Sequence, residues 1–243
     1  MITHIFFDLH GTLADGARVH ECYCAGVGRV LSGRYGGAPD AWARANRAIV
    51  ADWDSYFTDL DLAGDEGYAD MWEGYFRTTR AMFRLTDTPE PSKAELLKLT
   101  RELPGLAVEG CDALYPEVRG VLKQLGAAGY KLGAASNALL SQVRATLAGG
   151  GILGQFDAPI MAADVAEQWV KDADYYRIAA IKAQVPPSSC LVVDDNVEPL
   201  AGAREAGMRT AWVKRRQSEA QARVDVMLRD DLSALPQVIQ ALR

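Results

Sequence analysis

The sequence predicts an α/β fold, in which a sheet of parallel strands carries an all-helical insertion directly after its first strand. Two observations support this prediction. Short apolar runs alternate with helical patterns through the second half of the chain, and residues 15–95 have helical patterns without any strand. Alternation at this spacing is typical of a parallel sheet covered by helices on both faces. The core is therefore expected to be Rossmann-like.

The first strand is a short apolar run that ends at Asp8, where Gly11 and Thr12 form a turn. The further strands are expected at Lys131–Ser136, Ala158–Ala162, Cys190–Asp194, Thr210–Val213 and Val224–Leu228. Helices are expected between and after them, at Pro116–Ala128, Ala138–Ala148, Ala173–Ala183, Val197–Ala206 and Asp231–Leu242. Glycines at the predicted helix ends agree with these boundaries.

The helical insertion is rich in aromatic residues and closes at Thr86–Pro91, a segment with the composition of a linker. We therefore expect a core domain of residues 1–14 and 96–243 and a helical cap of residues 15–95. An insertion after the first strand would cover the carboxyl ends of the strands, where open α/β sheets place their ligands. Most of its aromatic side chains are expected to form its own core, with one or two facing the cleft.

Composition excludes several classes of function. The 243-residue chain has a formal net charge of −6, so it offers no basic field for nucleic acid or an anionic membrane. No signal peptide or membrane span is expected, because the apolar start is interrupted at Asp8. The four cysteines form no CxxC pair and are expected to be reduced thiols of a cytoplasmic protein. A monomer or a homodimer agrees equally well with the sequence.

Four groups at predicted strand ends carry the chemistry. They are Asp8 with its following turn, Ser136-Asn137, Lys171, and Asp194-Asp195. Converging carboxylates can hold a hard cation such as Mg²⁺, which neutralises a phosphoryl group while a carboxylate attacks it. A serine hydroxyl and a lysine ammonium are suitable donors to phosphoryl oxygens.

Each group has an ordinary structural alternative when taken alone. An aspartate or a serine at a strand end commonly caps a helix or forms a turn, and a single lysine is usually a solvated surface charge. Their order along the chain, with the helical insertion in the first gap, favours a shared site.

The chain resembles the haloacid dehalogenase (HAD) superfamily, in the subgroup with a helical cap after the first strand. Residues 8–12, Asp-Leu-His-Gly-Thr, are similar to its first motif, DxDGT. Ser136 ends a strand as in the second motif, Lys171 stands at the family's lysine, and Val193–Glu198 is similar to the fourth motif. The resemblance extends over nearly the whole chain.

This resemblance implies a phosphatase acting on a small phosphorylated metabolite. Asp8 would form an aspartyl-phosphate intermediate. Mg²⁺ would be held by Asp8, the main-chain carbonyl of His10, Asp195 and Asp194. Ser136 and Lys171 would position the phosphoryl oxygens. We further expect substrate contacts from Gly11, Thr12 and Asn137, and from Arg18 on the first cap helix; most cap arginines are expected to pair with acidic neighbours instead.

His10 departs from the family pattern, because phosphatases usually have an acid/base aspartate there. Imidazole can serve as acid or base near neutral pH. Dehalogenase members vary the same position, so a C–X hydrolase is an alternative, although two unneutralised carboxylates beside an anionic substrate disfavour it. A phosphonate-cleaving reaction is disfavoured because the cap has no lysine before Lys93. A second alternative is a non-catalytic binder of a phosphorylated ligand.

Overall fold

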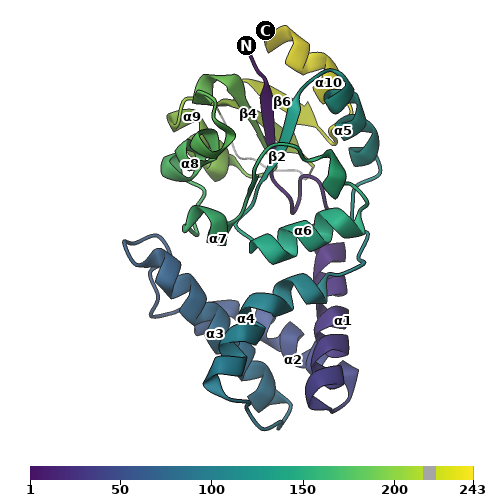
Figure 1. The fold of residues 1–243 in the computed structure, drawn as a ribbon, viewed down its shortest axis with the longest axis vertical. Coiled ribbons are helices and arrows are strands. Elements are labelled where there is room, and N and C mark those ends of the chain that lie inside the picture. Colours follow the sequence, from purple (N-terminus) through teal and green to yellow (C-terminus); the bar gives the residue numbers. More distant parts are fainter. Residues whose placement is uncertain (216–222, 243) are drawn as a thin grey trace.

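Six parallel strands form one sheet in a computed structural model of the protein, which describes residues 1–215 and 223–242. The order is β3-β2-β1-β4-β5-β6, so the first strand lies at the centre of the sheet (Figure 1). The strands are β1 (His4–Phe7), β2 (Lys131–Ala135), β3 (Ile160–Met161), β4 (Cys190–Asp194), β5 (Arg209–Lys214) and β6 (Val226–Arg229). The predicted α/β fold is confirmed.

Helices cover both faces because side chains alternate along each strand. In β1, Ile5 and Phe7 belong to one buried cluster and Phe6 to another. The first cluster contains side chains of α5 (Val118–Ala127), α6 (Leu140–Gly149) and α10 (Leu235–Val238). The second contains side chains of α8 (Ala173–Ala183) and α9 (Val197–Glu205). Ile5, Phe6 and Phe7 are therefore buried on both faces of the sheet, which matches this uninterrupted apolar run.

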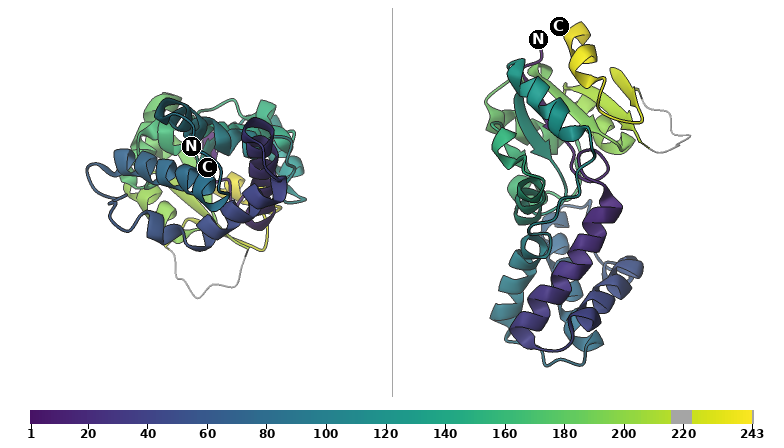
Figure 2. Two further views of the ribbon diagram at one scale, coloured as in Figure 1. Left: turned by 90° about the horizontal axis from the view of Figure 1, so that it is seen from below. Right: turned by 90° about the vertical axis from the view of Figure 1, so that its right-hand side faces the viewer.

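Four helices form a second body at the carboxyl ends of the strands, away from both chain termini (Figures 1 and 2). They are α1 (Gly16–Tyr35), α2 (Pro39–Ala51), α3 (Gly67–Leu85) and α4 (Lys93–Ala107), with the 3₁₀ helix η1 (Trp53–Tyr56) after α2. The remaining short elements belong to the core: η2 (Leu153–Gln155), α7 (Ala163–Ala166), η3 (Pro187–Ser189) and η4 (Ile239–Leu242). We refer to α1–α4 as the helical body.

The division expected at residue 95 does not match the packing of α4. Leu96, Leu99 and Leu103 of this helix lie in the same buried cluster as Val27 and Leu31 of α1. The prolines before it mark only the turn between α3 and α4, and Ser92 caps α4 by accepting a hydrogen bond from the Glu95 amide at 3.2 Å. We therefore propose that the helical body extends to Ala107, because a boundary at 95 would separate a helix from its core.

The chain crosses between the two bodies along two adjacent segments. The Asp15 amide donates to the Ala113 carbonyl at 2.9 Å, and the Tyr115 amide donates to the Leu13 carbonyl at 3.1 Å. The carboxylate of Asp15 also caps α1, accepting from the amide of Ala17 at 2.9 Å. The entry into the helical body is thus held against the segment by which the chain leaves it, residues 108–115, which we call the exit segment.

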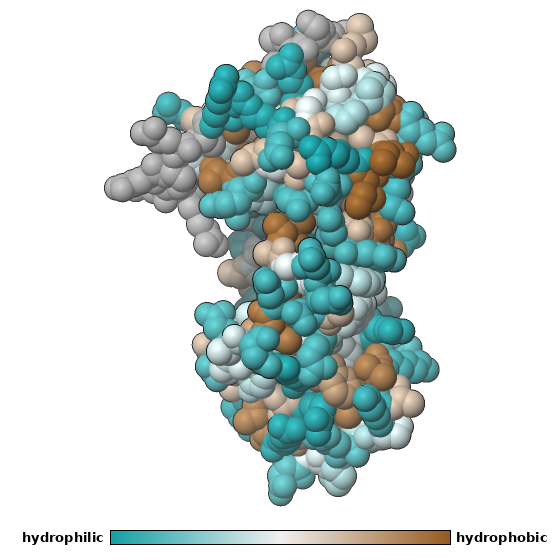
Figure 3. Space-filling view, turned by 90° about the vertical axis from the view of Figure 1, so that its left-hand side faces the viewer, coloured by the Kyte–Doolittle hydropathy of each residue, from teal (hydrophilic) through white to brown (hydrophobic). Residues whose placement is uncertain are grey.

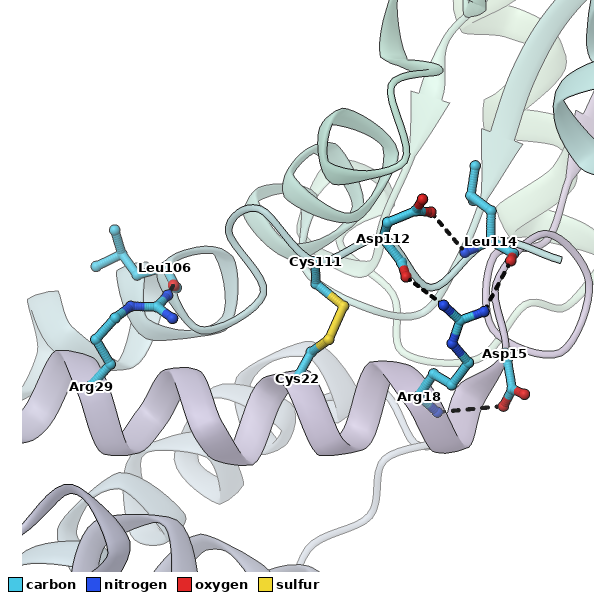
Figure 4. The surroundings of a disulfide bond; sticks show 8 residues. All are labelled: Asp15, Arg18, Cys22, Arg29, Leu106, Cys111, Asp112 and Leu114. Carbon is cyan, nitrogen blue, oxygen red and sulfur yellow. Dashed lines mark hydrogen bonds between the residues drawn. A yellow bond between two sulfur atoms is a disulfide. The ribbon is translucent and has the colours of Figure 1, made fainter. Parts of the chain in front are cut away.

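A disulfide links these two crossings, which corrects the expectation of four reduced thiols. Cys22 on α1 is bonded to Cys111 in the exit segment, with their Cα atoms 6.1 Å apart (Figure 4). Cys24 and Cys190 are free and buried. The two bonded cysteines are separated by 89 positions, so only the tertiary fold brings them together. Because two of the four cysteines are bonded, cysteine usage no longer supports the expected cytoplasmic location.

Two of the other predicted core elements are shorter than expected. The strand expected at Ala158–Ala162 is limited to Ile160–Met161 at the sheet edge, and the helix expected at Asp231–Leu242 is a single turn at Leu235–Val238 followed by 3₁₀ structure. No helix in the described part of the chain is long and apolar enough to cross a membrane. On the face shown in Figure 3, hydrophilic and hydrophobic residues are mixed over both bodies.

Candidate active site

Three polar side chains meet where neighbouring strands end. Asp8 follows β1, Ser136 follows β2, and Asp194 ends β4, and β1 pairs with both of the other strands. The amide of Asp8 donates to the Val193 carbonyl at 2.8 Å, which continues the pairing of β1 with β4 past the end of the strand. This edge is the topological switch point of the sheet, since the strand order reverses at β1.

Lys171 joins two of these carboxylates. Its Nζ lies 2.7 Å from Asp8 Oδ1 and 2.7 Å from Asp194 Oδ2, and it donates to the Ala135 carbonyl at 3.3 Å. Burial alone would lower the pKa of Lys171, but the carboxylates of Asp194 and Asp8 outweigh burial and raise that pKa well above its usual value. The ammonium is therefore a fixed positive charge inside the site.

Asp8, Asp194 and Asp195 form a cluster that suits a divalent cation. One carboxylate oxygen from each lies within 4.8 Å of the other two. Burial raises the pKa of both Asp194 and Asp195, and the charge of Asp8 adds to this effect. The second oxygen of Asp8 is buried, with no hydrogen-bond partner among the described residues. Three carboxylates facing one ammonium leave negative charge that a hard cation would neutralise.

Gly11 and Thr12 hold the loop that follows Asp8. Gly11 has φ +95°, and a Cβ at this position would lie 2.2 Å from Asp195 Oδ2, so only glycine allows the loop to approach this carboxylate. The Thr12 hydroxyl donates to Asp195 Oδ1 at 3.3 Å. Both residues therefore contact Asp195 directly, and the prediction that they touch substrate stays a prediction.

His10 lies between the carboxylate cluster and a cavity of the helical body. Its Nε2 is buried and has no hydrogen-bond partner in the described part of the chain. Burial lowers the pKa of His10, and the neighbouring charge of Asp8 opposes this. An unpartnered ring nitrogen is free to bond a ligand atom. The prediction that the main-chain carbonyl of residue 10 binds metal is not tested by these contacts.

The other predicted substrate contacts lie in different settings. Ser136 is buried, and its Oγ accepts from the Ala138 amide at 3.2 Å. Asn137 is exposed. Arg18 donates to the carbonyls of Asp112 at 2.8 Å and Leu114 at 3.4 Å, so its guanidinium fastens α1 to the exit segment (Figure 4). These contacts of Arg18 therefore lie at the crossing between the two bodies, and its predicted contact with substrate stays a prediction.

A cavity of about 370 Å³ extends from His10 into the helical body. It is lined by residues of α1, α2, η1, α3 and α4, together with Gln142 of α6. Tyr23, Trp53 and Tyr75 are among the lining residues, so three aromatic residues of the helical body line this cavity where one or two are expected to face the cleft. The cavity has the size of a small-molecule pocket.

Two supporting residues were not identified from the sequence. The Tyr175 hydroxyl donates to the Ser136 carbonyl at 2.9 Å, and the Trp212 indole donates to the Asp195 carbonyl at 3.0 Å. Trp212 is paired with Asp194 across β4 and β5. A strand register cannot be read from sequence periodicity, so the pattern gave no signal for this contact.

Comparison with known proteins agrees with this geometry. A family model described as a hydrolase, "haloacid dehalogenase-like hydrolase", matches residues 2–207. Protein CbbY of Cereibacter sphaeroides is 26% identical over 218 residues, covering 86% of this chain and 83% of that protein. A phosphoserine phosphatase of Thermus thermophilus is 28% identical over 197 residues, covering 78% and 74%.

Solved structures with a similar fold include both dehalogenases and a phosphatase. The L-2-haloacid dehalogenase of Xanthobacter autotrophicus is 20% identical, with a TM-score of 0.63 and 100% coverage of both chains. A HAD phosphatase of Thermococcus onnurineus is 19% identical, with a TM-score of 0.62 and 98% coverage of both chains. At these identities the likeness concerns the fold alone.

Proposed function

Since the chain belongs to the haloacid dehalogenase-like hydrolases, we propose that it is a Mg²⁺-dependent phosphatase of a small phosphorylated metabolite, with Asp8 as nucleophile. One observation carries the proposal. Asp8 has one carboxylate oxygen held by Lys171 at 2.7 Å and a second, buried oxygen without a partner, beside two further carboxylates. This combination provides an oriented nucleophile and a set of cation ligands in one place.

The reaction consists of two displacements at phosphorus. A carboxylate oxygen of Asp8 attacks the phosphorus atom, the bond from phosphorus to the ester oxygen breaks, and that oxygen leaves with the electron pair. Protonated His10 gives the leaving oxygen its proton. Neutral His10 then removes a proton from a water molecule, whose oxygen attacks the phosphorus of the aspartyl phosphate and releases phosphate and free Asp8. His10 ends each cycle protonated, as it began.

The charges of the site fit a cation and a phosphoryl group together. Asp8, Asp194 and Asp195 would hold Mg²⁺, which supplies positive charge to the phosphoryl oxygens. Lys171 stays charged between Asp8 and Asp194 and lowers their mutual repulsion. Thr12 and Gly11 fix the position of the Asp195 carboxylate. Ser136, buried at the end of β2, would donate its hydroxyl proton to a phosphoryl oxygen.

Dehalogenation is the second candidate, because several similar folds are dehalogenases. The charges disfavour it, since a haloacid would bring another anion to a buried cluster of three carboxylates and one ammonium. The two reactions also require different conditions. Mg²⁺-dependent phosphate release is lost in a chelator, whereas halide release by a metal-independent dehalogenase persists.

The test is release of phosphate from an aryl phosphate with Mg²⁺, beside release of halide from a 2-haloacid in a chelator. We expect phosphate release that Asp8→Asn abolishes and His10→Ala lowers by about 10²–10⁴-fold. Trp72→Ala, outside the carboxylate cluster, is the control for folding. Halide release without phosphate release would replace this proposal by dehalogenation. Ligand-induced stabilisation with no turnover of either compound would indicate a non-catalytic binder.

A further inference from the structure

The cavity that extends from His10 carries no permanent charge. Among the described residues that line it there is no aspartate, glutamate, lysine or arginine. Its titratable groups are His10, His20, Tyr23 and Tyr75. Burial raises the pKa of both tyrosines, so their hydroxyls stay protonated and neutral at physiological pH.

Arginines next to the lining residues in sequence are engaged elsewhere. Arg18 precedes Val19 and donates to the carbonyls of the exit segment. Arg47 follows Asn46 and pairs with Glu21 at 3.1 Å, outside the cavity. Three more arginines adjoin lining residues in the sequence. Arg77 pairs with Glu73 at 2.9 Å, and Arg80 pairs with Glu90 at 2.9 Å. The Arg101 guanidinium lies 5.4 Å from the centroid of the Trp72 ring. An anionic ligand tail would find no cation here.

The threonine hydroxyl groups in the wall already use their protons. Thr78 and Thr79 both donate to the Tyr75 carbonyl at 2.9 Å, and Thr100 donates to the Leu96 carbonyl at 2.8 Å. They remain acceptors, and the Asn46 amide donates to Cys24 Sγ at 3.3 Å. A ligand with a second anionic group would be buried with no lysine or arginine to pair with it, and burying an unpaired charge is costly.

Aromatic and aliphatic surfaces make up much of the remaining wall. Trp53 and Tyr75 are in contact, with ring centroids 6.1 Å apart, and Ile49, Met82 and Leu103 complete an apolar side. An apolar cavity of about 150 Å³ is enough to bind benzene. The cavity of about 370 Å³ therefore accommodates a ring with substituents.

We propose that this cavity binds an uncharged, predominantly apolar alcohol portion of the substrate, such as a substituted aromatic or alicyclic alcohol. The substrate is then the phosphate monoester of a neutral alcohol, and not a compound with a second phosphate or a carboxylate. That the substrate is a phosphate ester rests on the proposed phosphatase function. The preference of the cavity for neutral ligands does not depend on turnover.

The binding test compares benzyl alcohol with benzoate, which are similar in size and differ in charge. Saturation-transfer NMR on the intact wild-type protein measures both. We expect benzyl alcohol to bind about 10-fold or more tightly than benzoate. Trp53→Ala should weaken benzyl alcohol binding about 5-fold or more. Tyr35→Ala should leave it unchanged, because Tyr35 does not line the cavity and its ring lies against Phe83, another residue outside the lining.

The kinetic test compares benzyl phosphate with carboxybenzyl phosphate in the presence of Mg²⁺. We expect kcat/KM to favour benzyl phosphate by about 10-fold or more, with most of the difference in KM. Equal or tighter binding of benzoate, or no binding of either compound, overturns the inference. Preferential binding of benzyl alcohol without hydrolysis of any phosphate ester leaves the inference standing and overturns only the proposed function.

Discussion

The bond between Cys22 and Cys111 should make a large contribution to stability. It closes a loop across 89 positions, and the chain-entropy relation for such a loop gives about 4.6 kcal/mol at 25 °C. The closed loop includes almost all of the helical body, from α1 to the exit segment. In a domain of this size, that free energy corresponds to a melting temperature lower by about 10–18 °C after reduction.

The assay is thermal unfolding of the oxidised and the reduced protein, followed by circular dichroism. Cys22→Ser is the matched control, because its melting temperature should equal that of the reduced wild type and should not respond to reductant. The buried Cys190 is a second control, since Cys190→Ser leaves the disulfide and its response to reductant in place. Equal melting temperatures for oxidised and reduced protein, or four reactive thiols in the denatured non-reduced protein, would show that no disulfide stabilises the fold.

Three further predictions concern the carboxylate cluster. Gly11→Ala places a Cβ 2.2 Å from Asp195 Oδ2 and should weaken Mg²⁺ binding, measured by calorimetry, about 10-fold or more. Gly129→Ala is the control, because Gly129 also has a positive φ, +89°, but a Cβ there would have no atom within 4 Å. It shares the backbone strain and should leave the Mg²⁺ affinity unchanged. Lys171→Met leaves two buried carboxylates unpaired and should lower the free energy of unfolding of the metal-free protein, measured in urea, by about 3–5 kcal/mol. Lys131 pairs with Asp157 on the surface, so Lys131→Met should lower it by less than about 1 kcal/mol. Equal losses for the two variants would contradict this prediction. Burial raises the pKa of Asp194 and Asp195 in the folded protein, so the folded metal-free form binds more protons than the unfolded chain. Its free energy of unfolding therefore falls as the pH rises from the ordinary aspartate pKa through the raised values. Mg²⁺ should therefore raise the melting temperature more at about pH 8 than at about pH 5, and the reverse order would argue against a carboxylate metal site.

The sequence was most informative where local pattern and tertiary structure agree. The apolar run before Asp8, the strand Cys190–Asp194 and the helix Ala173–Ala183 all lie where periodicity and glycine signals place them. The convergence of Asp8 and Asp194 also follows from local reasoning, since parallel strands deliver their carboxyl ends to one edge. Lys171 is expected at a strand end, but it lies between α7 and α8, directly before the residue that caps α8.

Long-range contacts explain what the sequence could not provide. The disulfide forms because α1 lies against the exit segment. The assignment of α4 to the helical body depends on the packing of its leucines against α1, which its own sequence pattern does not reveal. Arg18 lies close to Asp8 in sequence, but two main-chain carbonyls of the exit segment hold its guanidinium. In each case the deciding partner is more than sixty positions away in the chain, beyond the reach of periodicity or capping signals.

The covalent state of Asp8 during turnover directly tests its role as nucleophile. The protein is mixed with Mg²⁺ and an aryl phosphate, quenched in acid within one turnover, and digested for peptide mass spectrometry. We expect one added phosphoryl group on the peptide containing Asp8, absent when a chelator replaces Mg²⁺ and absent in Asp8→Asn. Turnover that proceeds with no phosphoryl group on Asp8, or an Asp8 ester formed only from a haloacid in chelator, would contradict it.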